Sequence, residues 1–187
     1  MMALAGILDA EKANAEVLSI EGARGFSTFY GYYMLQAMAK AGNYEGAMQV
    51  IRDFWGGMLD MGATSFWEDF NIDWLPNAAP INELVPEGKK DIHGDFGAYC
   101  YEGFRHSLCH GWASGPVPFL AERVLGVNIE ESGCKTIRLK PDLGDLEWAE
   151  GAMALPDGNA VVVKLHKRKD DTVEVKIDAD KAKKWLN

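Results

Sequence analysis

Cysteine and basic residues are scarce in this chain of 187 residues. Its three cysteines, Cys100, Cys109 and Cys134, cannot all pair within one chain, and none belongs to a CxxC motif. We therefore expect buried or half-buried thiols rather than a disulfide framework. Basic residues number 19 against 28 acidic ones, which gives a net charge of −9. This balance argues against a nucleic-acid partner, because neutralising phosphates requires clustered Lys and Arg.

Long apolar runs are also absent. No stretch approaches the roughly 18 uncharged apolar residues of a membrane span, so no membrane partner is expected. The first residues, MMALAGILDAEKANAE, lack a basic segment and soon become acidic, which is not the pattern of a signal peptide. The compartment therefore stays unknown. The composition, 48% hydrophobic and 25% charged, is that of a folded domain rather than a disordered chain.

The first two thirds of the sequence have a helical pattern of apolar residues. Helices are predicted over residues 10–20, from 27 or 28 to 41, over 44–61, and within 101–127, the last with Pro116 and Pro118 near its start and Gly126 at its end. Asp9 is a suitable N-cap for the first of them. The connection AGNY between the second and third is short, so these two should form an antiparallel hairpin. Residues 70–98 contain three prolines and no periodicity, which predicts a long ordered loop.

After about residue 127 the apolar pattern changes to a period of two. Short strands are predicted over residues 136–140, 146–149, 160–165 and 172–177, separated by the turn sequences PDLGD, LPDGN and KRKDD. Four short strands are few for an independent β domain. The apolar helix faces also need neighbours, so we expect a homo-oligomer that forms through exposed helix faces.

The densest group of chemically useful residues is GATSFWEDFNIDW, residues 62–74. Here Glu68, Asp69 and Asp73 alternate with four aromatic residues. Aromatic faces stack on the C–H face of a sugar, and carboxylates accept hydroxyl hydrogen bonds or act as acid and base. The alternative is an amphipathic segment with buried aromatic rings and solvated acids. Composition leaves both interpretations open.

A second group lies in HGDFGAYCYEGFRHSLCHGW, residues 93–112. Glu102, His106 and His110 are spaced so that an unbroken helix would present them on one face. That spacing permits a zinc site but does not diagnose one, and there is no HExxH. Histidines that are buried or hydrogen-bonded are the simpler interpretation, so no metal is expected. His110, followed by Trp112, would alternatively direct a polar group and a ring into a pocket.

The order of these segments resembles the C-terminal part of bacterial α-L-rhamnosidases of glycoside hydrolase family 78. The resemblance lies in FSTFYGYYMLQAMAKAGNYEGAM, GGMLDMGATSFWEDF, SLCHGWASGPVPFLAERVLGV and IRLKPDLGDLEWAEGAMALPDG, which together cover about residues 22–158. It implies an α+β multidomain fold. Residues 1–127 would supply helical hairpins from the end of an (α/α)6 barrel, and residues 128–187 an incomplete C-terminal antiparallel β-sandwich.

The resemblance also implies an activity, the inverting hydrolysis of terminal α-L-rhamnosyl groups on a polysaccharide or glycoside, without a cofactor. In an inverting glycosidase one carboxylic acid protonates the leaving oxygen, and a second carboxylate about 6.5–9.5 Å away activates water. Glu68 falls on the family's general-base position. The substrate-binding residues implied by the resemblance are Trp67, Asp69, His110 and Trp112.

The family's general acid lies upstream of the part that this chain resembles, and no second acid-rich barrel motif is present. A six-hairpin barrel also needs more helical residues than this chain offers, at about 11–12 residues per helix. We therefore expect a C-terminal fragment that carries the general-base half of the site and is inactive alone, with a parent enzyme that is periplasmic or secreted. The alternatives are a noncatalytic carbohydrate-binding or assembly fragment, or another (α/α)6-barrel glycosidase with a different sugar specificity.

Overall fold

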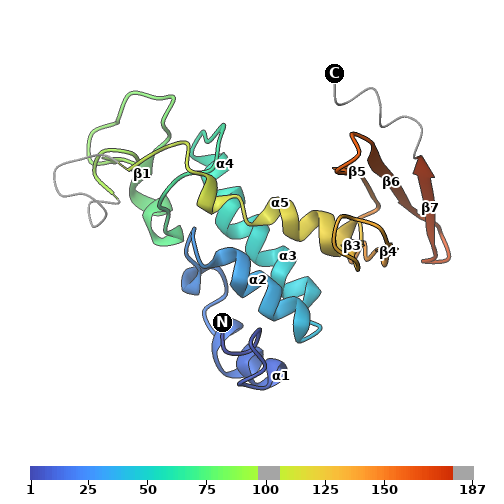
Figure 1. Ribbon diagram of the computed structural model, residues 1–187. Coiled ribbons are helices and arrows are strands. Elements are labelled where there is room, and N and C mark those ends of the chain that lie inside the picture. The colour runs from blue at the N-terminus through green and yellow to red at the C-terminus, as the bar shows by residue number, and fades with distance from the viewer. Residues whose placement is uncertain (97–105, 179–187) are drawn as a thin grey trace. The chain divides into compact units, whose positions relative to one another are not determined.

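The computed structural model describes residues 1–96 and 106–178. It divides into two compact units, Met1–Pro116 and Val117–Asn187. The first is mainly helical and the second mainly strand, which confirms the expected α+β class (Figure 1). The predicted domain boundary at residues 127–128 stays a prediction. No helix within the described ranges is both long and apolar enough to cross a membrane.

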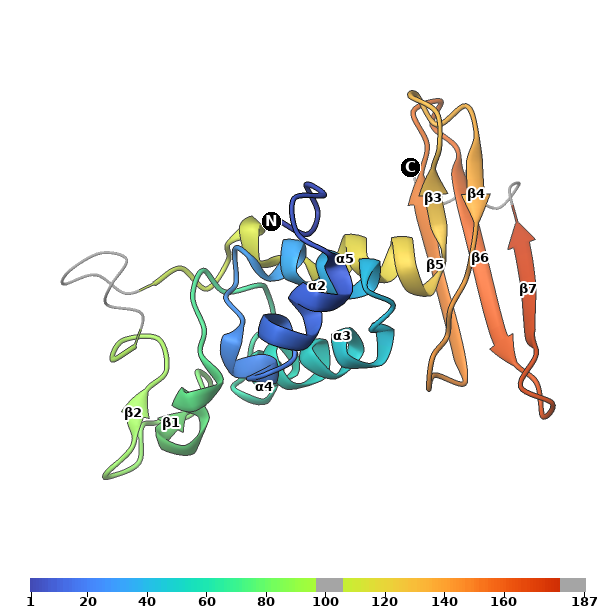
Figure 2. The same ribbon diagram turned by 90° about the horizontal axis from the view of Figure 1, so that it is seen from below.

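The helices of the first unit follow the predicted order but are shorter or interrupted. The α-helices are α1 (Ala10–Ala13), α2 (Gly31–Lys40), α3 (Tyr44–Val50) and α4 (Gly56–Asp60). Asp9 caps α1 by accepting a hydrogen bond from the Lys12 amide at 2.8 Å. The π-helical turn Ile51–Trp55 joins α3 to α4, so the predicted third helix is one continuous helical run. α2 and α3 lie side by side and form the predicted hairpin (Figure 1; Figure 2).

The core of the first unit is built where this hairpin packs. α2 buries Leu35 and Met38, while the run from α3 to α4 buries Val50, Phe54 and Met58 at helical spacing. Burying each large apolar side chain of this kind contributes about 1.5–3 kcal/mol to folding. These contacts fix the position of the chain that leaves α4, which is the segment carrying Glu68.

The predicted loop over residues 70–98 contains regular structure that the sequence pattern did not indicate. A 3₁₀ helix spans Ile72–Asn77, and the two-residue strands β1 (Ala78–Ala79) and β2 (Lys90–Asp91) pair in parallel. Strands of two residues are too short to produce a visible alternation, which explains why they were missed.

In the described part of the helical segment predicted within residues 101–127, the helix begins at Pro116 and ends before Gly126, as the sequence indicated. That part holds only the 3₁₀ turn Gly111–Ala113, α5 (Pro116–Phe119) and the π-helical turn Leu120–Val124. Proline lacks a backbone N–H and is tolerated only in the first turn of a helix, so Pro116 and Pro118 force the helix to begin there. Residues 97–105 lie outside the described residues. They include Cys100, expected to be a buried or half-buried thiol, and Glu102, expected to share a helix face with His106 and His110.

The second unit contains two antiparallel sheets. β3 (Val127–Ile129) pairs with β4 (Ile137–Leu139), and β5 (Trp148–Ala154), β6 (Ala160–Lys167) and β7 (Val173–Asp178) form a sheet in that order (Figure 2). The four predicted strands are confirmed with shifted ends, and β3 was missed. Along β6, Val163 and Leu165 are buried, whereas Lys164 faces the other way and forms an ion pair with Glu150.

Candidate active site

Two chain segments that are far apart in the sequence meet at Glu68. The Glu68 amide donates to the carbonyl of Ser107 at 2.8 Å, and the His110 amide donates to the carbonyl of Phe66 at 2.7 Å. These two backbone hydrogen bonds hold the segment that contains Glu68 beside the segment that contains His110 and Trp112. The two groups of residues that the sequence presented separately therefore belong to one site.

The carboxylate of Glu68 is buried, with the residue only 3% exposed. Its Oε2 accepts a hydrogen bond from the backbone N–H of Ser107 at 2.8 Å, and Nδ1 of His110 lies 3.9 Å from the same oxygen. A hydrogen bond to a charged acceptor stabilises the fold by about 1.5–3 kcal/mol. One oxygen of the carboxylate is thus anchored by the main chain.

The backbone of Glu68 is fixed as firmly as its side chain. Its carbonyl accepts hydrogen bonds from Oγ1 of Thr28 at 2.5 Å and from Nε1 of Trp112 at 2.9 Å. A carbonyl oxygen has two lone pairs, so these two donors satisfy it completely. Thr28 is buried just before α2, which connects the position of Glu68 to the helical hairpin.

Aromatic side chains form the exposed border of this site. The Trp112 ring lies 4.0 Å from the His110 ring and 5.6 Å from the Phe29 ring, measured between centroids. Trp112 is 42% exposed, in contrast to the buried Glu68. A buried carboxylate next to an exposed aromatic face is an arrangement suited to contacting a sugar ring.

Trp67 and Asp69, the two predicted substrate-binding neighbours of Glu68, are both buried. The ring of Trp67 is fully enclosed and lies near those of Phe70 and His106, with centroid distances of 6.1 and 6.2 Å. Its Nε1 has no hydrogen-bond partner among the described residues. Asp69 has an interaction of its own. Substrate contacts by these two residues stay predictions.

The acidic segment continues to Asp73, which points away from this arrangement toward solvent. Its Oδ1 accepts a hydrogen bond from Nε of Arg24 at 2.6 Å, and both side chains are more than half exposed. The hydrogen bond and the charge of Asp73 raise the pKa of the Arg24 guanidinium. Asp73 therefore belongs to a surface ion pair, as expected for the solvated acids of an amphipathic segment.

The histidines do not form a metal centre in the described part of the chain. His106 is fully buried, with Nδ1 3.3 Å from the Phe96 carbonyl, while His110 is partly exposed beside Glu68. Residues 1–96 and 106–178 contain no group of three or more His, Cys, Asp or Glu side chains arranged to hold a metal ion. Cys109 and Cys134 are free thiols; Cys134 is half-buried as expected, but Cys109 is exposed, so the prediction of a buried or half-buried thiol is wrong there.

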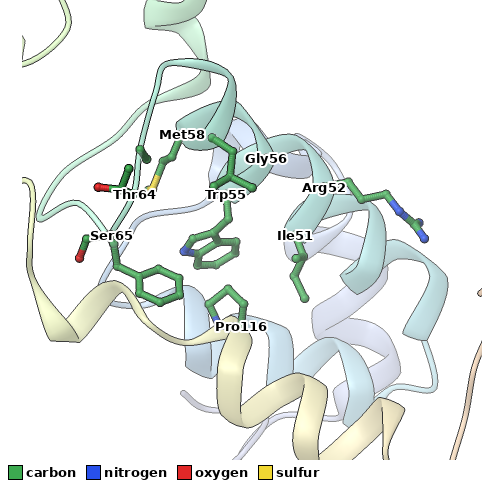
Figure 3. Close-up of a pocket in the computed structure, with 11 residues that line it drawn as sticks. Ile51, Arg52, Trp55, Gly56, Met58, Thr64, Ser65 and Pro116 are labelled. Atoms are coloured by element: carbon green, nitrogen blue, oxygen red, sulfur yellow. The ribbon is translucent and has the colours of Figure 1, made fainter. Parts of the chain in front are cut away.

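A separate pocket of about 640 Å³ lies in the first unit beside the helical run from α3 to α4 (Figure 3). Figure 3 shows Trp55 and Pro116 facing each other across it, while Arg52 extends outward. The pocket is bordered mainly by apolar side chains, and neither Glu68, His110 nor Trp112 lines it. It contains no carboxylate and is therefore distinct from the candidate active site.

Three contributors to this site were not predicted from the sequence: Thr28, Phe29 and the amide of Ser107. Thr28 and Phe29 lie at the start of the α2 region, about forty residues before Glu68, and Ser107 follows it by 39 residues. A backbone N–H leaves no mark in a sequence, because every residue except proline has one. Only the aromatic character of FSTFYGYY could have drawn attention to Phe29.

The site combines the buried carboxylate of Glu68 with the partly exposed ring of Trp112. No family model and no curated protein matches this chain. Among solved structures, it is similar to a GH78 family rhamnosidase from Bacillus sp. GL1, with 26% identity and a TM-score of 0.70. The match covers 97% of this chain but 17% of that chain, so this chain spans less than a fifth of the rhamnosidase. The resemblance to family 78 rhamnosidases is thereby confirmed at the level of structure.

Proposed function

We propose that this chain carries the general-base half of a glycosidase site that hydrolyses terminal α-L-rhamnosyl groups with inversion. The observation that carries the proposal is the carboxylate of Glu68, which is buried, anchored through Oε2 by the Ser107 amide and adjacent to His110. The structural similarity to a rhamnosidase supports rhamnose as the sugar. The matching architecture would be part of an (α/α)6 barrel for the first unit and part of a β-sandwich for the second.

In this mechanism Oε1 of Glu68 accepts a proton from a water molecule as the water oxygen attacks the anomeric carbon. The glycosidic C–O bond breaks at the same time, and a separate carboxylic acid protonates the leaving oxygen. The Ser107 amide holds Oε2 and stabilises the negative charge of the base before the reaction. His110 and Trp112 would contact the sugar from the exposed side, with the Trp112 ring against its C–H face.

The general acid has to come from elsewhere than the acidic segment itself. Asp73 is engaged with Arg24 at the surface, and Asp69 directly follows the base in the chain. An inverting site needs its two carboxyl groups about 6.5–9.5 Å apart on opposite sides of the sugar, with room for water between the base and the sugar. We therefore propose that other residues supply the acid and that the 187-residue chain alone has no rhamnosidase turnover.

The decisive experiment substitutes Glu68 in an active protein that contains this sequence. Glu68→Gln should lower kcat on an aryl α-L-rhamnoside by about 10²–10⁴-fold with little change in KM, because glutamine is isosteric but cannot accept the proton. Asp73→Asn is the matched control and should retain normal turnover. NMR of the first-formed product should show inversion, that is, β-L-rhamnose. Normal kcat in Glu68→Gln would contradict the assignment.

Two further experiments separate the remaining alternatives. A panel of aryl glycosides tests whether a different sugar is the substrate, since rhamnosides should be cleaved fastest. Self-association through exposed helix faces stays a prediction, and it depends on exposed apolar residues such as Val17 and Leu59. Size-exclusion chromatography over a range of concentrations tests it.

A further inference from the structure

The aromatic surface next to Glu68 continues beyond Trp112. Phe29 lies 5.6 Å from Trp112, and Tyr30 lies 5.0 Å from Phe29, measured between ring centroids. Both residues are exposed, Tyr30 by 54%. Exposure therefore increases along one line of contacts, from buried Glu68 through His110 and Trp112 to Phe29 and Tyr30.

These rings are held in place although they are exposed. Phe29 contacts Tyr33 as well as its two neighbours, with interplanar angles of 63–72° across the three pairs. The Tyr30 amide donates to Oγ of Ser27 at 3.3 Å, which orders the turn before α2. Aromatic side chains have few rotatable bonds, so ordering them when a ligand binds costs little conformational entropy.

The angles between the rings indicate which ligand fits. Rings turned by more than 60° present faces and edges in different directions, and they leave no parallel slot for a flat aromatic group. A pyranose is not flat and carries C–H groups on both faces and along its edge, so it makes contacts in several directions. The exposed Tyr30 hydroxyl adds a hydrogen-bonding group that suits sugar hydroxyls.

We propose that Phe29 and Tyr30 bind the sugar ring on the leaving-group side of the scissile bond. The substrate is then a rhamnosyl oligosaccharide or polysaccharide, in preference to a rhamnoside whose aglycone is a flat aromatic group. This inference rests on the proposed function, because Glu68 defines where the rhamnosyl group lies. It adds Tyr30 to the site and gives Phe29 a role toward the second sugar ring.

Isothermal titration calorimetry of the 187-residue chain tests the proposal with three kinds of probe. These are L-rhamnose, p-nitrophenyl α-L-rhamnoside, and a set of α-L-rhamnosyl-glucose disaccharides that differ in linkage. The best disaccharide should bind about 10-fold more tightly than L-rhamnose. The aryl rhamnoside should exceed the affinity of L-rhamnose by a smaller factor. Phe29→Ala and Tyr30→Ala should both reduce this gain, and Tyr30→Ala should leave the affinity for L-rhamnose within about twofold.

Trp148→Ala is the matched control, because Trp148 is also an exposed aromatic residue but belongs to the second unit. It should change none of the affinities. Circular dichroism checks that the variants fold, which is expected because both substituted rings are exposed. If L-rhamnose binds and no disaccharide binds more tightly, the leaving-group site is overturned while the proposed function stands.

If the affinity of the aryl rhamnoside exceeds that of L-rhamnose by as much as the affinity of the best disaccharide does, the proposed preference for a second sugar ring is overturned. A disaccharide gain that survives both alanine substitutions overturns the role of these residues. If none of the probes binds, including L-rhamnose, both the leaving-group site and the binding role of the Glu68 site are overturned. Failure of the proposed function is therefore distinguishable from failure of this inference.

Discussion

Ser107 donates its backbone N–H to Oε2 of Glu68 over 2.8 Å, and the Glu68 amide donates back to the Ser107 carbonyl. This reciprocal pair joins two segments that are 39 residues apart. It fixes the backbone of Glu68 and its carboxylate through the same residue. The geometry of the proposed base thus depends on main-chain groups, and substitutions that remove an N–H should reveal this dependence.

Ser107→Pro should lower the free energy of unfolding by about 1–3 kcal/mol, because it leaves the buried Oε2 of Glu68 without its donor. Ser107→Ala keeps the N–H and loses only the contacts of Oγ with Cys109, so it should cost less. Urea unfolding of both variants measures the difference. In a Glu68→Gln background the cost of proline should shrink, because the charged acceptor is gone. If Ser107→Pro lowers the free energy of unfolding equally in the wild-type and Glu68→Gln backgrounds, proline acts through backbone strain alone.

The carbonyl of Glu68 offers a second test, because it has two donors. Thr28→Val and Trp112→Phe each remove one donor and keep most of the side-chain volume. Each should cost about 0.5–1.5 kcal/mol, since the other donor remains. The double variant leaves a buried carbonyl unsatisfied and should cost more than the sum of the two. Strict additivity in chemical denaturation would contradict this shared role.

Close packing at position 31 requires a glycine, and the sequence pattern does not indicate this requirement. A Cβ at this position would lie 2.7 Å from the ring of Trp55, which is itself buried and donates from Nε1 to the Ala113 carbonyl at 2.8 Å. Gly31→Ala should therefore destabilise the first unit by about 1–3 kcal/mol. Gly56→Ala is the control, because a Cβ there meets nothing within 4 Å and alanine favours a helix. Thermal unfolding should move in opposite directions for the two variants.

Much of the fold follows from patterns that the sequence displays. Apolar spacing located α2 and the long run from α3 to α4, and alternation located the strands of the second unit. The errors have physical causes. β1 and β2 are too short to show a period. At the site, the sequence identified Glu68, but Thr28 and the Ser107 amide approach it through tertiary contacts.

Asn43 joins the start of α3 to the region of α1. Its Oδ1 accepts a hydrogen bond from the Gly46 amide at 3.0 Å, and its Nδ2 donates to Oδ1 of Asn14 at 3.1 Å and Oγ of Ser19 at 3.2 Å. Asn43→Ala should cost about 1 kcal/mol or more, because the N-cap is lost with these contacts. Asn43→Asp keeps the cap and loses only the Nδ2 donor, so it should unfold at an intermediate denaturant concentration. Equal stability of the two variants would rule out a capping role.

Asp157 should make the stability of the second unit depend on pH in the acidic range. Its carboxylate accepts hydrogen bonds from the Asn159 amide at 3.0 Å and from Asn159 Nδ2 at 2.9 Å, and these bonds lower the pKa of Asp157. Because the pKa of Asp157 is lower in the folded than in the unfolded protein, its ionised carboxylate stabilises the fold at pH values above the unfolded-state pKa of about 3.9. This stabilisation is lost as the pH falls through the folded-state pKa. Asp157→Asn should remove it.

The stability difference between the wild type and Asp157→Asn should therefore shrink between about pH 6 and about pH 3. Calorimetric unfolding at several pH values measures the difference, and an NMR titration of the Asp157 carboxyl measures the pKa directly. Asn159→Ala is the matched intermediate, because it removes Nδ2 but keeps the backbone donor, so the pKa should remain below its ordinary value by a smaller margin. A wild type and an Asp157→Asn variant that lose stability in parallel on acidification would show that this turn does not respond to protons.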